Sequence, residues 1–173
     1  MKEMLKGISN LFIVGFTILL STCTSNKPVQ IKPEKTVNID TCFYPNGQIE
    51  EICATIDSMK QGISLEFDSL GKIRRVSTYK NGIQEGPYIQ YYSSGKILSK
   101  SYYKQDIWLG EFILYYENGN IECRYSYGSD GKLDGISDFY TTDGILSRSL
   151  LFTKGKIMKV IFDNGKLPPY ISE

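Results

Sequence analysis

The chain has 173 residues, enough for one domain, and its 20 Lys and Arg residues nearly balance 19 Asp and Glu residues. This scattered, near-neutral charge lacks the basic surface needed to bind a phosphate backbone, so we exclude nucleic acid as a partner. The chain contains no histidine, which excludes histidine-based nucleophile pairs and histidine-ligated zinc. We predict a protein that is not an enzyme and has no catalytic residue, metal site or cofactor.

Residues 1–22 have the pattern of a signal peptide. Lys2 and Lys6 give a positively charged start, and an apolar run follows from Leu11 to Leu20. These ten residues are too few for a membrane-spanning helix, which needs about 20, but they match the hydrophobic region of a signal peptide. The pattern therefore predicts export.

The end of this run, Leu20-Ser21-Thr22-Cys23, resembles a bacterial lipobox, in which the cysteine is lipidated. Thr22 departs from the Gly, Ala or Ser usual at its position, and cleavage by the ordinary signal peptidase is the alternative. The place of Cys23 directly after the apolar run favours lipidation, with residues 23–37 as the lipidated cysteine and a flexible tether. The resemblance implies a cell-envelope lipoprotein, held by its lipid in the outer membrane of a Gram-negative bacterium.

Two columns of glycines repeat through the rest of the chain. The first is spaced by 24, 24, 24 and 25 residues, and the second by 24, 24 and 25. Both columns take up one extra residue at the same place, near residues 129–133, so they belong to one repeat. We predict about five β-hairpin units and a truncated sixth at 38–166, followed by a tail at 167–173. The structural glycines are Gly47, Gly71, Gly95, Gly119 and Gly144 in the first column and Gly62, Gly86, Gly110 and Gly135 in the second.

Each unit begins with a strand that ends in an aromatic residue before a tight glycine turn. A three-residue loop would pair Tyr115 with Ile121, whereas a two-residue loop would pair Tyr116 with Ile121. The Tyr115 column is always aromatic, so we choose the three-residue loop. On that register the predicted core face carries Ile63, Leu65, Phe67, Ile73, Tyr79, Ile89, Tyr91, Ile97, Tyr103, Ile113, Tyr115, Ile121, Tyr125 and Tyr127.

The period and the stretch Tyr115-Tyr116-Glu117-Asn118-Gly119-Asn120-Ile121 resemble the MORN-repeat family. The nearest match is its bacterial variant class, which includes YwqK-type antitoxin components, and it covers roughly Asn38 to Lys166. The resemblance implies an all-β fold of stacked antiparallel β-hairpins that form an elongated, twisted sheet. The typical unit has Trp or Tyr with Glu after the first glycine, whereas we expect the single tryptophan, Trp108, in a loop.

The predicted outer face also carries aromatic residues, which are the candidate partner-binding surface: Tyr88, Tyr92, Phe112 and Tyr116. The alternative is that these side chains pack under loops or a neighbouring strand.

Acidic residues suggest no catalytic site. Adjacent strand residues face opposite ways, so Glu50 and Glu51 cannot converge on one cleft, and Asp130 and Asp134 belong to a turn. Cys42 and Cys53 flank one hairpin, so they are predicted either to form a disulfide or to be small buried residues in strands. Cys123 is the third cysteine of the domain, and an odd number cannot all pair internally.

The function predicted from these patterns is non-catalytic. We expect an envelope lipoprotein whose repeat surface mediates a protein–protein interaction. The first alternative is an antitoxin or immunity-like protein that neutralises a toxin, and the second is a glycan-binding module.

Overall fold

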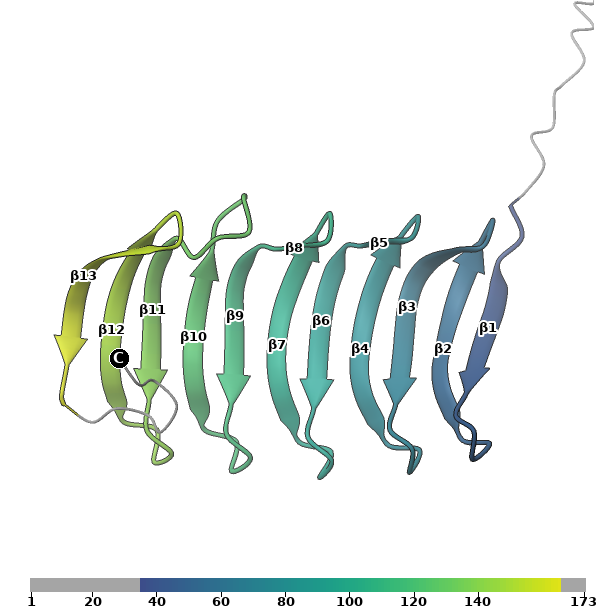
Figure 1. Cartoon of the computed structure of the whole chain (residues 1–173), viewed down its shortest axis with the longest axis horizontal. Helices are drawn as coiled ribbons and strands as arrows, with labels where there is room; N and C mark the ends of the chain where they lie inside the picture. Colours follow the sequence, from purple (N-terminus) through teal and green to yellow (C-terminus); the bar gives the residue numbers. More distant parts are fainter. Residues whose placement is uncertain (1–34, 166–173) are drawn as a thin grey trace, which may run out of the picture. The chain divides into compact units, whose positions relative to one another are not determined.

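The computed structural model describes residues 35–165, which form one antiparallel sheet (Figure 1). Hydrogen-bonded neighbours follow the order β1-β2-β3-β4-β6-β7-β9-β10-β11-β12-β13, while β5 pairs with β4 and β8 with β7. The strands are β1 (Asn38–Phe43), β2 (Ile49–Ile56), β3 (Met59–Phe67), β4 (Ile73–Lys80), β5 (Ile83–Gln84), β6 (Gly86–Tyr91), β7 (Ile97–Lys104), β8 (Ile107–Trp108), β9 (Gly110–Tyr115), β10 (Ile121–Tyr127), β11 (Gly135–Tyr140), β12 (Leu146–Thr153) and β13 (Lys156–Asp163). The predicted all-β class of stacked hairpins is confirmed.

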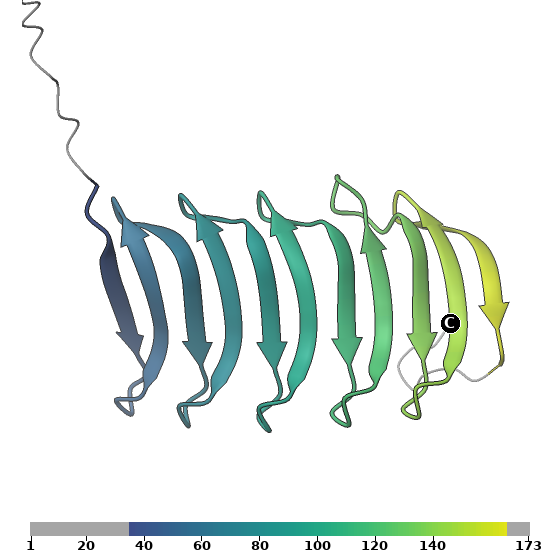
Figure 2. The same cartoon turned by 180° about the vertical axis from the view of Figure 1, so that it is seen from behind.

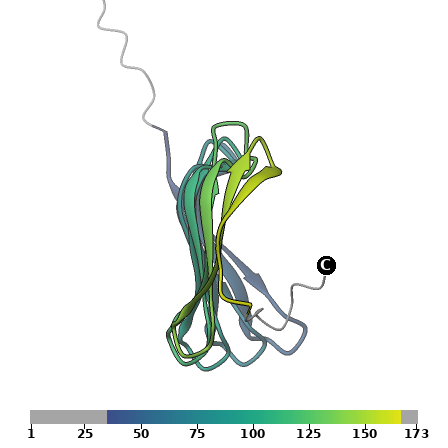
Figure 3. The same cartoon turned by 90° about the vertical axis from the view of Figure 1, so that its left-hand side faces the viewer.

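The sheet is a single curved layer. Figure 2 shows its back and Figure 3 shows it edge-on, and within residues 35–165 no second layer covers either face. In that same part of the chain no helix is long and apolar enough to cross a membrane. The predicted signal peptide, Cys23, the tether up to residue 34 and the tail at 167–173 lie outside the described residues.

The tight turns have the predicted three-residue loop. In the fourth hairpin Tyr115 pairs with Ile121, Gly119 N–H donates to the Tyr116 carbonyl at 2.9 Å, and Tyr116 N–H donates to the Asn120 carbonyl at 2.8 Å. Gly119 has a φ of 95°, which explains why glycine stands at the last loop position. All five turns of this kind show the same aromatic-to-aliphatic pairing.

A β-bulge that the sequence analysis did not anticipate follows each tight turn. In the fourth hairpin, Tyr115 pairs with Ile121 but Leu114 pairs with Cys123, so Glu122 is an extra residue in β10. One extra residue reverses the alternation of side chains along the rest of that strand. The predicted core face is therefore wrong for four residues, which lie on the opposite face from the Tyr115 column: Tyr79, Tyr103, Tyr125 and Tyr127.

The two faces of the sheet differ in what they carry. The face that holds the Tyr115 column, with residues such as Ile63, Ile89 and Ile97, is called the aliphatic face below. The face that holds Tyr103, Trp108 and Tyr127 is called the ladder face. Their membership follows from the strand registers, because directly paired residues lie on the same face.

The core lies on the ladder face, contrary to the prediction. Its C-terminal cluster consists of Cys123, Phe139, Leu150 and Phe152. On the aliphatic face, Ile63 is 61% exposed and Ile73 is 41% exposed. The uniformly apolar column does not mark the buried side. No second layer covers either face, so burial depends on how neighbouring side chains pack along one face, as they do in the cluster of the ladder face.

Neighbouring hairpins are joined at the tight-turn edge by tyrosine hydroxyls. The hydroxyl of Tyr44 donates to the Phe67 carbonyl at 2.8 Å, and that of Tyr92 donates to the Tyr115 carbonyl at 2.6 Å. Tyr116 repeats the contact one hairpin later. These bonds link each turn to the strand end of the following hairpin, each adding about 1 kcal/mol.

Candidate functional site

Aromatic side chains form a continuous row on the ladder face, called the aromatic ladder. Its members are Tyr88, Tyr103, Trp108, Phe112, Tyr125, Tyr127 and Phe139. Successive ring centroids lie between 5.1 and 5.9 Å apart along this row. Tilted and edge-to-face contacts at such distances are favourable for aromatic pairs. The ladder therefore crosses the sheet from β6 to β11 as one packed surface.

Glycines of the second column lie across from several of these rings. Gly86 pairs with Tyr103, and Gly110 pairs with Tyr127. Gly86 has a φ of 127°, and a Cβ there would approach the Thr78 side chain to 2.9 Å. A Cβ at Gly110 would meet nothing within 4 Å. The positive φ of both residues, 127° at Gly86 and 76° at Gly110, therefore explains the glycines at these positions.

Two of the four predicted partner-binding residues belong to the ladder. Tyr88 is buried, with 8% of its surface exposed, and Phe112 is half-buried. The other two, Tyr92 and Tyr116, are half-buried at the tight-turn edge, where their hydroxyls hold the next hairpin. The structure thus brings Tyr88 and Phe112 into one surface and places Tyr92 and Tyr116 outside it.

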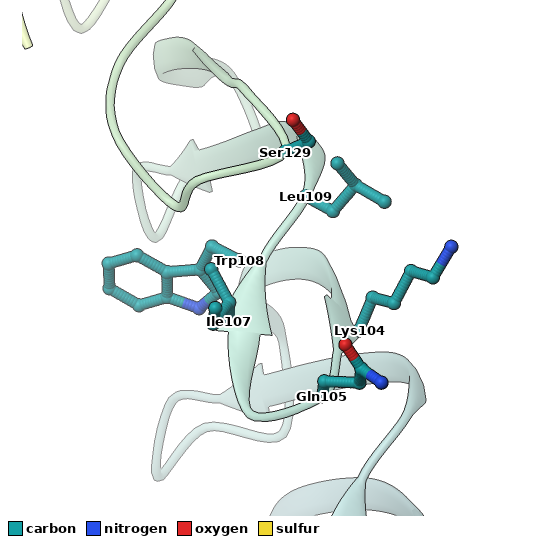
Figure 4. A pocket seen from close by; sticks show the side chains of 6 residues that line it. All are labelled: Lys104, Gln105, Ile107, Trp108, Leu109 and Ser129. Carbon is teal, nitrogen blue, oxygen red and sulfur yellow. The ribbon is translucent and has the colours of Figure 1, made fainter. Parts of the chain in front are cut away.

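The sequence analysis missed Tyr103, Trp108, Tyr125 and Tyr127 as members of this surface. Trp108 was expected in a loop, whereas it lies in β8 and pairs with Tyr103. Figure 4 shows its indole directed away from the side chains of Lys104 and Leu109, which line a hollow of about 230 Å³ beside β8. The signal that could have found Tyr103 and Tyr127 is the second glycine column, because Gly86 and Gly110 pair with them.

Burial governs the chemistry of the ladder hydroxyls. Desolvation raises the pKa of Tyr103, of Tyr125 and of Tyr127 above the ordinary value for tyrosine. Beneath them, burial raises the pKa of the Cys123 thiol to about 11. These groups stay protonated at neutral pH, so the ladder can offer apolar area and hydroxyl donors but no ready nucleophile.

Ion pairs continue the ladder face toward the N-terminus. Arg75 pairs with Glu66, lies within 3.4 Å of the Tyr88 hydroxyl and sits over the Tyr88 ring at 6.0 Å from its centroid. Lys60 pairs with Glu51 and lies 5.1 Å from the centre of the Tyr79 ring. Cation–π contacts therefore connect the ion pairs of β2 to β4 with the tyrosines of the ladder face.

The carboxylates Glu51 and Glu66 face each other directly across β2 and β3. Burial opposes ionisation of Glu51, but hydrogen bonds from Lys60 and Ser64 hold its pKa below the ordinary value. A general acid needs the opposite, a carboxyl whose pKa is raised toward neutrality. Glu51 and Glu66 are therefore carboxylates neutralised by ion pairs, not candidates for acid catalysis.

The other acidic residues considered in the sequence are structural. Glu50 is the exposed bulge residue beside Glu51, and Asp130 caps its own turn by accepting from Lys132 N–H at 3.2 Å.

The three described cysteines are free thiols. Cys42 is exposed on β1, whereas Cys53 and Cys123 are buried on the ladder face. Cys42 and Cys53 are therefore unpaired, and the predicted burial is right for Cys53 and wrong for Cys42.

Comparison with known proteins matches three segments to a family described as MORN repeat variant: residues 60–81, 84–105 and 108–128. No curated protein matches the chain. A solved structure described as the GtfA/B complex bound to UDP and GlcNAc is similar at 11% identity and a TM-score of 0.28, over 79% of this chain. This chain spans about a quarter of the length of that one. The three matched segments span β3 to β10, so the similarity to this family covers the centre of the sheet and most of the aromatic ladder.

Proposed function

We propose that this chain is a non-catalytic lipoprotein of the cell envelope that binds a protein partner through the aromatic ladder. Repeats of the matched class are commonly modules that bind proteins or membranes, which supports a non-catalytic role. The export pattern of residues 1–22 and the lipobox-like Cys23 support the anchor in an outer membrane.

The observation that carries the proposal is the composition of an uncovered face. Seven aromatic rings and the adjoining Arg75 form one surface on a single-layer sheet. Tyrosine, tryptophan and arginine are the residues most enriched among those that dominate binding energy at protein interfaces. Half-buried rings in fixed positions lose little conformational entropy when a partner covers them.

Site-specific photocrosslinking tests which face binds. A photoreactive phenylalanine analogue replaces Tyr127 on the ladder face in one variant and Ile63, which is exposed on the aliphatic face, in the control, each in the full chain in its own envelope. We expect a discrete crosslinked species only from position 127, and its loss on Trp108→Leu. Equal yields from both faces would contradict the proposal.

The anchor has its own test. Mass spectrometry of the mature N-terminus should find acyl chains on Cys23, and Cys23→Ala should release the protein from the membrane fraction. A mature chain that begins at another residue and carries no lipid would contradict the membrane anchor. It would not contradict the binding role of the aromatic ladder.

A further inference from the structure

Two hollows of the same construction lie one hairpin apart on the aliphatic face, away from the aromatic ladder. The first has a volume of about 440 Å³ and the second about 310 Å³. The first is lined by Gly95, Lys96, Ile97, Lys100, Tyr115, Asn118 and Gly119. The second is lined by Gly119, Asn120, Ile121, Arg124, Tyr140 and Gly144. Each therefore combines a turn glycine, an isoleucine, a cation and the tyrosine of the next hairpin.

The cations in these hollows are not required by the fold. The position of Lys100 and Arg124 is occupied by Ile52, Val76 and Ser149 in the other hairpins, which have the same backbone pairing. Within the described residues, no carboxylate lines either hollow. Each hollow therefore places a cation beside apolar surface, a combination that suits an anionic ligand.

The two cations differ in how far they are neutralised. Lys100 lies beside Ile113 of β9 and 5.8 Å from the centre of the Tyr115 ring. Arg124 lies beside Asp138 of β11, and its Nε is 4.0 Å from a Glu111 carboxylate oxygen. We expect Lys100 to supply more of the attraction for an anion, because Arg124 already has two acidic neighbours.

The spacing of the hollows selects the shape of the ligand. One hairpin is two strands wide, and strands lie about 4.8 Å apart, so equivalent positions repeat every 9.6 Å or so. A polyproline II helix has three residues per turn and rises about 9.3 Å per turn. Side chains three residues apart on such a helix point the same way, so a peptide lying across the strands can place one side chain in each hollow.

We propose that the aliphatic face binds a proline-rich, acidic peptide segment in the polyproline II conformation, with carboxylates three residues apart on Lys100 and Arg124. Proline rings between the carboxylates pack on Tyr115 and Tyr140, as proline-rich segments pack in aromatic-lined grooves. The site is separate from the aromatic ladder and does not depend on its function.

The hydrogen bonds around the hollows favour a peptide over an acidic polysaccharide. The side-chain amides of Asn118 and Asn120 both donate to the Thr142 carbonyl at 2.8 Å. The Lys96 ammonium donates to the Glu117 carbonyl at 2.8 Å. These polar groups are already engaged within the protein, so few remain for the many hydroxyls of a sugar chain, whereas proline rings need none.

Fluorescence anisotropy with the full chain in detergent tests this proposal with three probes. The first is a labelled peptide of four Glu-Pro-Pro triplets. The second has the same composition with its glutamates in adjacent pairs, which keeps the charge but breaks the three-residue spacing. The third is a labelled oligogalacturonate. We expect the first probe to bind about ten-fold more tightly than the second, because only it reaches both cations at once.

Variants locate the site. Lys100→Gln should weaken the first peptide about ten-fold and Arg124→Gln less, whereas the charge-matched control Lys156→Gln should leave its affinity within about two-fold. Val76→Lys should add a third cation to the row and tighten a peptide lengthened by two triplets. Circular dichroism confirms that each variant keeps the sheet.

Three outcomes would overturn the proposal. Equal binding of both peptides would show attraction by charge alone, without the polyproline II spacing. Binding of only the oligogalacturonate would assign the face to a glycan. No binding by any probe, or loss of binding equal in the control variant, would remove the site.

Discussion

The ladder face is filled in two different ways along the chain. Glu66, Gln90, Leu114 and Phe139 occupy one position in successive hairpins, each directly before the aromatic residue of the tight turn. In the N-terminal half this position is polar, and its surroundings are ion pairs and fully buried serines such as Ser64, Ser77 and Ser99. In the C-terminal half it is apolar and belongs to the core cluster.

The difference shows that the hairpin backbone accepts either polar or apolar side chains on the ladder face. The backbone ladder and turns are the same in both halves, and the C-terminal half also has fully buried serines, Ser137 and Ser147, beside its apolar cluster. Ser64 donates to Glu51 at 2.5 Å and Ser99 donates to Gln90 at 3.0 Å, so the polar half has hydrogen-bond partners where the apolar half has packing. We expect the two halves to respond differently to truncation, to loss of charge and to acid.

The largest effect should come from Phe139→Ala in the apolar half. Phe139 is 5% exposed and contacts the Tyr125 ring, so its removal leaves a cavity that costs about 3 to 5 kcal/mol of unfolding free energy. Gln90→Ala, at the same position of the polar half, should cost about 1 kcal/mol. Denaturant unfolding of both variants measures the difference. Equal losses would mean that the polar half is packed as tightly as the core cluster.

A smaller effect should follow from breaking the ion pair in the polar half. Glu66→Leu leaves Arg75 half-buried without its main partner, which should cost about 2 kcal/mol. Removing both charges with Glu66→Leu and Arg75→Met should recover part of this loss, since the same pair of positions holds Leu114 and Cys123 in the fourth hairpin. A double-mutant cycle by thermal unfolding measures the coupling. Additive losses would show that the pair contributes no interaction of its own.

The contact between hairpins at the tight-turn edge should contribute less. Tyr116→Phe removes the hydroxyl that donates to the Tyr140 carbonyl at 2.8 Å, and should cost about 1 kcal/mol. Hydrogen exchange should show faster opening of the fourth and fifth hairpins, with the first hairpin as the internal control. Unchanged exchange at Tyr140 and its neighbours would show that the bond adds nothing to the stacking.

Acid should destabilise the polar half locally. Of the four changes, it should have the smallest effect on the stability of the whole chain. The pKa of Glu51 is lowered in the folded state, so its contribution is present above its ordinary pKa and is lost as pH falls through the folded value. Residues 49–67 should therefore lose exchange protection as pH falls below the ordinary pKa of glutamate, while β11 keeps its protection. Glu51→Gln should remove this pH dependence, and its persistence in that variant would assign it elsewhere.

Local regularity explains which parts of the fold were predictable. The turn glycines, the three-residue loop and the Tyr115–Ile121 pairing depend on residues close in sequence, and the structure has them as expected. The β-bulge was not predictable in the same way, because residues such as Glu122 carry no special sequence mark. The face assignment of Tyr103 and Tyr125 therefore failed although the register at the turn was right.

The candidate surface was partly predictable for the same reason. Tyr88 and Phe112 lie before the bulge in their hairpins, so alternation counted from the turn placed them on the correct face. Tyr127 and Trp108 lie beyond a bulge or in the short β8, where counting from the turn no longer holds.

By itself the sequence determined the repeat, the hairpin register at each tight turn and the all-β class, because these follow from glycine spacing and short-range turn geometry. Only the tertiary structure decided which face is buried. The bulge after each tight turn reverses the alternation of side chains along the rest of the strand, and neighbouring hairpins then pack those side chains together. The tertiary structure also decided that rings distant in sequence form one aromatic ladder, and that cations of two hairpins lie in matching hollows on the other face.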